Sequence, residues 1–167
     1  MKRFLFFMLA LLPVIAIAKK PKNVRLAIVS PQYKDPAVFQ DDNVTFEFSW
    51  DSSDIGVNVK ISNNTDSRIY IEWENSRLDD EPICFGSDNS FTYRDQKPDE
   101  VVHSGSYSKR FVARKSQFEN DYRRLFYWDS TFKKYGESSA VPIIIPIKIG
   151  DNVTDYSFQI KVVSDKE

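Results

Sequence analysis

The stretch that most constrains the fold of this chain is residues 56–74, GVNVKISNNTDSRIYIEWE. Every second residue from Val57 to Ile61 is apolar, and the same holds from Ile69 to Trp73. Alternate side chains of a strand point to opposite faces, so each run has one apolar and one polar face. The intervening residues 63–67, NNTDS, are typical of a turn. The pattern predicts a half-buried antiparallel hairpin with Trp73 in the core.

The rest of the chain predicts more short strands separated by turns. Pro142 and Pro146 remove ladder donors, so the segment that contains them is predicted to be an edge strand, or to bulge at Pro146. Residues 30–43 contain Pro31 and Pro36 and are predicted to form a loop. The architecture expected from these patterns is a single antiparallel β-sandwich of about 7–9 strands. The further predicted strands are residues 24–29, 44–50, 83–85, 90–94, 107–113, 141–149 and 156–163.

One segment departs from the β pattern. Ser116 and Glu119 have the spacing of a capping box, in which each side chain bonds the other residue's backbone amide. The apolar residues that follow are spaced along one helical face. We therefore predict one short helix over residues 117–127, with its apolar face turned towards the sandwich. The residues of that face are Phe118, Tyr122, Leu125 and Phe126.

The order of these elements resembles a known family. A strand, an Asn-rich turn and a strand ending in Trp occupy residues 57–73, and a Ser-Gly-Ser turn at 104–106 precedes the strand at 107–112. This order resembles bacterial extracytoplasmic immunoglobulin-like domains, and it is also similar to the first domain of periplasmic pilus chaperones. The resemblance covers residues 57–113 and implies an immunoglobulin-like sandwich. It assigns no functional residue, because the pair of basic residues that anchors a pilin carboxylate has no counterpart here.

The first residues have the features of an export signal. Lys2 and Arg3 precede an apolar run over residues 4–18, which ends in the small-x-small sequence Ala16-Ile17-Ala18. The run is shorter than the roughly 20 residues that span a bilayer, which disfavours the alternative of a membrane anchor. We expect residues 1–18 to be a signal peptide and 19–167 the domain. The expected location is the periplasm or the extracellular medium, without membrane insertion after cleavage.

Several classes of function find little support in the composition. A formal net charge of −1 gives no indication of nucleic-acid binding. The single cysteine, Cys84, cannot form an internal disulfide and is predicted to be a buried thiol, with an intermolecular disulfide as the alternative. A Cys84–His103 dyad is the only candidate for catalysis, and it is disfavoured because His103 adjoins a turn.

Metal and cofactor sites are not predicted either. The acidic pairs and triplet at 41–42, 51 and 54, and 79–81 lack the spacing of a calcium loop and are predicted to be solvated turn residues. The sequons that begin at Asn43, Asn63 and Asn152 are likewise interpreted as turns. We predict a protein that is not an enzyme and binds no cofactor.

The best candidate for partner binding is the segment around residues 114–135, where basic and aromatic residues cluster. Such residues are enriched at interfaces. The partner expected is another envelope or extracellular protein. Three alternatives stay open: apolar residues that only complete the core, beside solvated basic groups; a carbohydrate-binding module that stacks sugars on its aromatic residues; and a periplasmic chaperone-like protein. The candidate residues are Arg123, Arg124, Tyr127, Trp128, Lys133, Lys134 and Tyr135.

Overall fold

The computed structural model describes residues 23–51, 55–85, 99–118, 124–127, 132 and 135–164, without the side chain of Phe118. The predicted signal peptide and the predicted strand at 90–94 lie outside these residues. No helix within the described ranges is long and apolar enough to cross a membrane.

The fold is all-β and antiparallel, as predicted, with eleven strands among the described residues rather than 7–9. The strands are β1 (Val24–Ser30), β2 (Val38–Gln40), β3 (Val44–Trp50), β4 (Gly56–Asn63), β5 (Ile69–Ile71), β6 (Arg77–Leu78), β7 (Glu81–Phe85), β8 (Glu100–Val102), β9 (Tyr107–Arg114), β10 (Val141–Ile149) and β11 (Asn152–Ser164).

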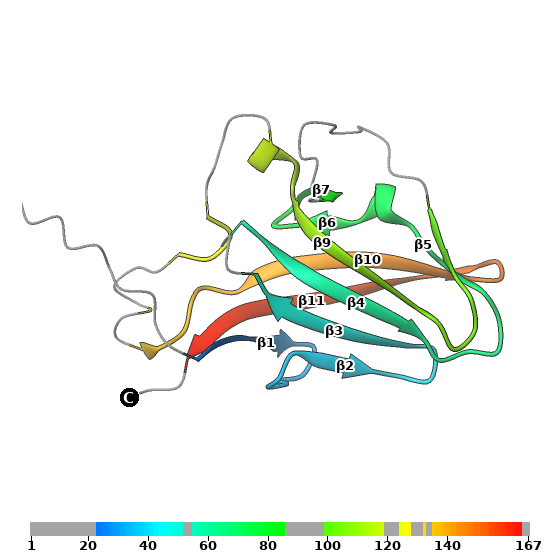
Figure 1. Ribbon diagram of the computed structural model, residues 1–167, viewed down its shortest axis with the longest axis horizontal. Coiled ribbons are helices and arrows are strands. Elements are labelled where there is room, and N and C mark those ends of the chain that lie inside the picture. The colour runs from blue at the N-terminus through cyan, green and yellow to red at the C-terminus, as the bar shows by residue number, and fades with distance from the viewer. Residues whose placement is uncertain are drawn as a thin grey trace, which may run out of the picture.

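These strands form one sheet that curls into a nearly closed barrel. The strand order is β1-β11-β10-β6-β7-β9-β4-β3-β2, and β5 and β8 extend from β10 beside β6. In Figure 1, β3, β4 and β9 lie in one layer, and β10, β11 and β1 lie behind them in the other. Strand β7 joins the two layers, because it pairs with β6 on one side and with β9 on the other.

The hairpin predicted over residues 56–74 does not form. Strand β4 pairs with β3 and β9, whereas β5 pairs with β10 and β8 in the opposite layer. The buried faces were predicted correctly, because Val57, Val59 and Ile61 are buried, as are Ile69 and Ile71. Alternation fixes which face of a strand is buried, but it does not say which strand lies alongside.

The turn chemistry at residues 63–67 explains how the chain crosses between layers. The amide of Asn63 donates to the carbonyl oxygens of Ser67 (2.6 Å) and Val102 (3.0 Å), and its side-chain oxygen accepts from the Thr65 amide (2.9 Å). Asn63 is buried, so these bonds satisfy a polar group that would otherwise be costly to bury. The segment is therefore a bonded crossover and not the loop of a hairpin.

The prediction that residues 141–149 form an edge or a bulge is also wrong. Strand β10 pairs with β11 in unbroken register, and on its other side with β6 and β5. The carbonyls of Pro146 and Pro142 accept from Glu72 and Asp79 on that other side, at 3.0 and 2.8 Å. The N–H and C=O of one residue in an antiparallel strand point the same way, so both missing proline donors face the interrupted β5–β6 side. The ladder with β11 loses nothing.

The helix predicted over residues 117–127 is not present as such. The chain forms a 3-10 helix, η2 (Lys115–Phe118), and residues 124–127 are not helical. A segment of this length is marginal as an isolated helix, so tertiary packing decides its conformation. Leu125 and Phe126 are buried, as predicted, although they are adjacent residues in an irregular segment. Two further 3-10 or helical turns are η1 (Trp73–Asn75) and a turn that includes Phe132 and Tyr135.

Three strands were missed, namely β2, β6 and β8. Strand β2 lies within the predicted loop 30–43, and β6 begins a tight hairpin with β7. Asp79 and Asp80, which connect β6 to β7, have φ values of 54° and 62°. Asp tolerates this left-handed conformation better than most residues, and two such residues are what a two-residue hairpin turn requires.

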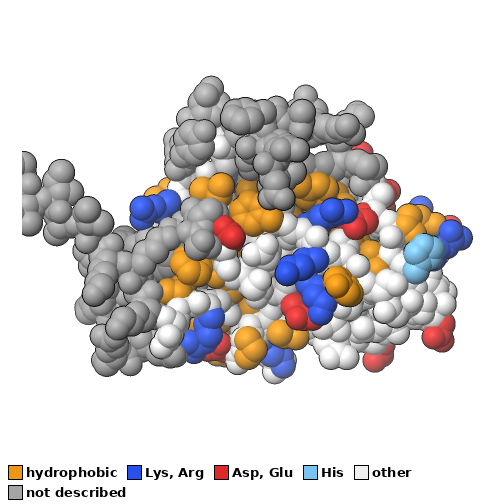
Figure 2. Space-filling view, viewed as in Figure 1, with side chains coloured by type: hydrophobic (Ala, Val, Ile, Leu, Met, Phe, Trp, Pro, Cys, Tyr) orange, Lys and Arg blue, Asp and Glu red, His pale blue; other side chains and the backbone are white. Residues whose placement is uncertain are grey.

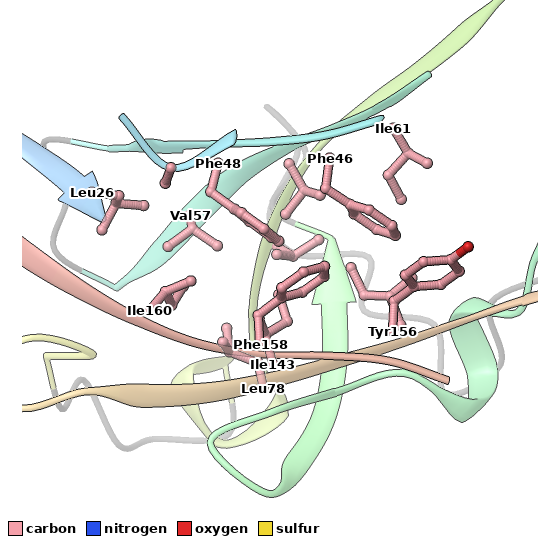
Figure 3. Packing of buried hydrophobic residues seen from close by; sticks show 14 of the residues in the cluster. Leu26, Phe46, Phe48, Val57, Ile61, Leu78, Ile143, Tyr156, Phe158 and Ile160 are labelled. Atoms are coloured by element: carbon pink, nitrogen blue, oxygen red, sulfur yellow. The ribbon is translucent and has the colours of Figure 1, made fainter. Parts of the chain in front are cut away.

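The core lies between the two layers (Figure 3). Phe158 of β11 packs against three rings, with centroid distances of 5.2 Å to Phe39, 5.1 Å to Phe46 and 5.2 Å to Phe48. Trp73 is 1% exposed, which confirms its predicted place in the core.

Candidate functional site

The predicted partner-binding residues are only partly described. Arg124, Tyr127 and Tyr135 are exposed, whereas Arg123, Trp128, Lys133 and Lys134 lie outside the described residues. Phe132, from the same segment, is buried with Leu125 and Phe126. Binding by this segment therefore stays a prediction.

Arg114, at the start of the same basic segment, has a structural role. Its side chain is 7% exposed, and its guanidinium lies 2.7 Å from the Asp79 carboxylate. It also donates to the carbonyl oxygen of Arg124 at 3.5 Å. A buried charge that lost its partner would be strongly destabilising, so Arg114 holds the β6–β7 turn rather than offering a surface charge.

The structure does not bring Cys84 and His103 together. The buried Cys84 thiol donates to the carbonyl oxygens of Arg114 (3.3 Å) and Ala113 (3.6 Å), at the end of β9. His103 lies in the turn before Tyr107, at the start of that strand. The length of β9 separates them by about 20 Å at the usual rise per residue. This pair cannot act as a dyad.

Two of the acidic and sequon positions, Asp41 and Asn63, have structural roles in turns. No group of three or more His, Cys, Asp or Glu side chains within the described ranges is arranged to hold a metal ion. Asp41 bonds the amides of Asn43 and Val44, both at 2.8 Å, and so stabilises the turn before β3. Asn63, the acceptor of the second sequon, is buried and hydrogen-bonded.

The strongest candidate site was not predicted, and it is one edge of β11. This strand has 13 residues, and β10 runs along residues 152–160 on one side. On the other side β1 runs along residues 159–164 only. Figure 1 shows β1 ending well before β11 reaches its turn with β10. We call residues 152–158 the free half of β11 and residues 159–164 the covered half.

The register of the ladders shows which backbone groups the free half exposes. Because Pro142 and Pro146 direct their backbone groups towards β5 and β6, the odd-numbered residues of β10 face β11. Their partners in β11 are the even-numbered residues from 152 to 160. The odd-numbered residues of β11 therefore face away from β10. In the covered half they meet β1, and in the free half they meet no described strand. These unpaired residues are Val153, Asp155 and Ser157.

The two faces of the free half differ. Val153 is 50% exposed, and Asp155 and Ser157 are also exposed. Tyr156 and Phe158 point inward, where both rings contact the half-buried Phe39 of β2, at 6.0 and 5.2 Å between centroids. The backbone is therefore open, while the side chains beneath it are anchored in the core.

A hydrogen bond holds the inward-pointing side chain of Tyr156 in the free half of β11. The Tyr156 hydroxyl donates to the Asp41 carboxylate at 2.8 Å. Burial, the hydrogen bond to Asp41 and the negative charge of that residue together raise the pKa of Tyr156 to about 12. Since the carboxylate accepts a hydrogen bond from the phenol, the neutral tyrosine is the form that the fold stabilises.

Strand β1 stops where it does because the chain turns away. Ile28 exchanges two backbone hydrogen bonds with Lys34, at 2.9 and 3.0 Å, which closes a loop that contains Pro31. The chain then enters β2, which pairs with β3 in the other layer. No strand of the described residues occupies the line that β1 would follow along β11.

A second stretch lacks a ladder partner among the described strands, but side chains close it. Of those strands, only β4 pairs with the first part of β9, since β7 meets β9 at Val112–Arg114. Across the gap, Arg110 forms two hydrogen bonds with Glu100 of β8, at 2.9 and 3.0 Å, and lies 5.4 Å from the centroid of Phe85. Trp73 also donates to Glu100, at 3.0 Å. Side chains fill this gap, whereas no described strand or side chain closes the edge of β11 at residues 152–158.

Glu100 is held ionised within that filled gap. Burial alone would raise the pKa of its carboxyl, but hydrogen bonds from Arg110 and Trp73 and the charge of Arg110 together lower it below the usual value. The charged carboxylate is therefore the form that links the two layers.

The outer face of β3, β4 and β9 offers less for recognition. Figure 2 shows this side with basic and acidic groups dispersed among uncharged ones. Lys60 pairs with Glu47 at 2.6 Å and lies 5.2 Å from the centroid of Tyr107. Tyr107 is exposed, and Phe111 further along the same strand is half buried. The described part of this face lacks the three coplanar exposed aromatics expected of a carbohydrate platform.

Comparisons with known proteins leave the chain without a family. No protein-family model matches it, and no curated protein matches it. A solved structure of a protein from Archaeoglobus fulgidus is similar over 89% of this chain and 99% of its own length, with 13% sequence identity and a TM-score of 0.30. A TM-score this low does not establish a shared fold.

Proposed function

We propose that this chain is an exported, non-enzymatic module that binds a protein partner in the bacterial envelope or outside the cell, by adding an extended strand of that partner to β11. The observation that carries the proposal is the free half of β11, where Val153, Asp155 and Ser157 present backbone donors and acceptors along one line. Main-chain hydrogen bonds supply the affinity in strand addition, and alternate side chains supply the specificity.

The surroundings of this edge favour an added strand. Phe39 lies beneath the free half of β11. Its ring is only half buried and contacts Tyr156 and Phe158. An added strand would cover this ring with its inward side chains, and it would give the unpaired backbone groups their partners. Export rests on the signal-like residues 1–18, and the absence of enzymatic activity rests on the composition of the chain.

An immunoglobulin-like architecture is part of the proposal. The layer β3-β4-β9-β7 and the layer β5/β6-β10-β11 follow the ABED and CFG strand orders of such sandwiches, with β1 and β2 as additions at the edges. A chaperone-like protein is one form of the proposed function, because such a protein also binds its client through a sheet edge.

Photo-crosslinking in the living cell tests this function. A photoreactive amino acid is placed at Val153, on the free half, and in a matched variant at Ser49, which is exposed on the outer face of the other layer. We expect one discrete adduct from position 153 that is lost when Ser157→Pro removes an edge donor, and no such adduct from position 49. Identical adducts from both positions, or an adduct that Ser157→Pro leaves unchanged, would contradict strand addition.

A further inference from the structure

We infer that the free half of β11 selects strands that place a basic side chain opposite Asp155; this rests on the strand-addition function proposed above. Asp155 lies at the centre of the three unpaired residues, with its side chain on the outer face. A residue paired directly with it in an added strand projects on that same face, about 5 Å away. Opposite charges in such a position attract, and like charges repel.

The neighbourhood leaves the carboxylate of Asp155 available. No described side chain forms an ion pair or hydrogen bond with it. The cross-strand partner of Asp155 in β10 is Pro146. Lys148, the nearest cation by register, is the partner of Val153. Asp151 adjoins the turn, and Glu72 flanks Pro146 from the far side, so the local charge is negative.

The charge also argues for a foreign strand over a second copy of this chain. Residues 152–158 contain one acid and no base. In a symmetric antiparallel pair of two free halves centred on this edge, the two Asp155 side chains would meet, which is destabilising. The charge of Asp155 therefore disfavours self-association through this edge. A strand of different sequence, with a basic residue opposite Asp155, is a better partner.

The inner face adds a second requirement. The residues of an added strand that pair with Tyr156 and Phe158 point inward and contact the half-buried Phe39. All ladders between described strands are antiparallel, so we take the added strand as antiparallel. Read from its N-terminus, it has apolar residues opposite Phe158 and Tyr156, and a basic residue immediately after the second of them.

A pair of peptides tests the inference with the folded full chain. The probes are the capped seven-residue peptides VSVKTTS and VSVETTS, which place Lys or Glu opposite Asp155 when they pair with residues 158–152. Binding is measured by titration calorimetry at low salt, where the charge pair is least screened. We expect the Lys peptide to bind about fivefold more tightly than the Glu peptide, and the order to reverse with Asp155→Lys.

The outcomes separate the two proposals. Equal affinity for both peptides that Asp155→Lys leaves unchanged would overturn the charge selection and leave strand addition standing. Binding of neither peptide, with the amides of the free half unperturbed by NMR, would overturn both proposals, and Asp155 would then serve only to prevent aggregation. A matched Asp151→Lys variant changes the residue just before the free half of β11. We expect it to leave the order of affinity of the two peptides unchanged.

Discussion

The two halves of β11 both bury the side chains of their inner face. They differ along the edge that faces away from β10, where only the covered half pairs with a described strand. The covered half gives its odd-numbered backbone groups to β1, and the free half gives the same groups to no described strand. Both halves send alternate side chains into one core, from Tyr156 and Phe158 to Ile160 and Val162. A strand can therefore be fixed firmly by its side chains and by one ladder while its other edge stays open for recognition.

The largest expected effect is the loss of stability on truncating a core side chain of β11, and it should be similar in both halves. Phe158→Ala removes a buried ring that contacts Phe39, Phe46 and Phe48, and should lower the free energy of unfolding by about 3–5 kcal/mol. Ile160→Ala in the covered half should cost about 2–5 kcal/mol. Urea denaturation measures both. A loss near 0.5 kcal/mol for Phe158→Ala would mean that the free half is not anchored in the core.

The hydrogen bond between Tyr156 and Asp41 should have a smaller effect with a pH signature. Tyr156→Phe removes a bond to a charged group and should cost about 1.5–3 kcal/mol at neutral pH. The folded-state pKa of Tyr156 is about 12, above the ordinary value of 10.0. The contribution is therefore fully present below pH 10 and is lost as the pH rises towards 12. Denaturation at pH 8 to 11.5 should show the wild type and the variant converging; a constant difference would contradict this assignment.

The filled gap at β9 sharpens the comparison, because there side chains replace a missing ladder. Arg110→Ala should cost about 1 kcal/mol, near the upper end for partly exposed ion pairs. Lys60→Ala, which breaks an exposed pair with Glu47 within one layer, should cost less. The pKa of Glu100 is lowered in the fold, so its contribution is present above the ordinary value of 4.5 and is lost as the pH falls through the folded-state pKa. Acid titration of the wild type and Arg110→Ala should show their difference in stability shrinking as the pH falls below the ordinary pKa of Glu100; an unchanged difference at low pH would count against this role.

The smallest expected effect is at the edge itself. Asp155→Ala should change the free energy of unfolding by about 0.5 kcal/mol or less, as for surface sites without partners. It should also increase concentration-dependent self-association, because the like-charge repulsion is gone. Sedimentation velocity checks this, with Asp151→Ala as the matched control. A large loss of stability would show that Asp155 has a structural role within the fold.

The sequence predicted the faces of the strands better than their partners. Alternation from Val57 to Ile61 and from Tyr156 to Val162 placed the core side chains correctly, because period-two burial is a local property. The pairing of β4 and β5 was predicted wrongly, since the Asn63 bond to Val102, which helps carry the chain between layers, is long-range. The prediction that the prolines place β10 at an edge was wrong for a related reason. Whether the missing N–H donor of a proline weakens a ladder depends on which neighbouring strand it faces.

The candidate site was beyond the reach of sequence patterns. Val153, Asp155 and Ser157 look like any exposed face of a strand, and their importance arises only because β1 stops at Ser30. One signal was available, since Pro31 and Pro36 limit how far β1 can extend along a neighbour. The predicted basic and aromatic segment around residues 114–135 remains a separate prediction.

Hydrogen exchange along β11, followed residue by residue by NMR, tests the central claim most directly. In the free half the amides of Thr154, Tyr156 and Phe158, which face β10, should exchange slowly. Those of Val153, Asp155 and Ser157 should exchange at least about tenfold faster. In the covered half the amides of Lys161 and Val163, which face β1, should be protected. Protection of Val153, Asp155 and Ser157 equal to that of Lys161 and Val163 would show that the edge is already covered, and would contradict the account.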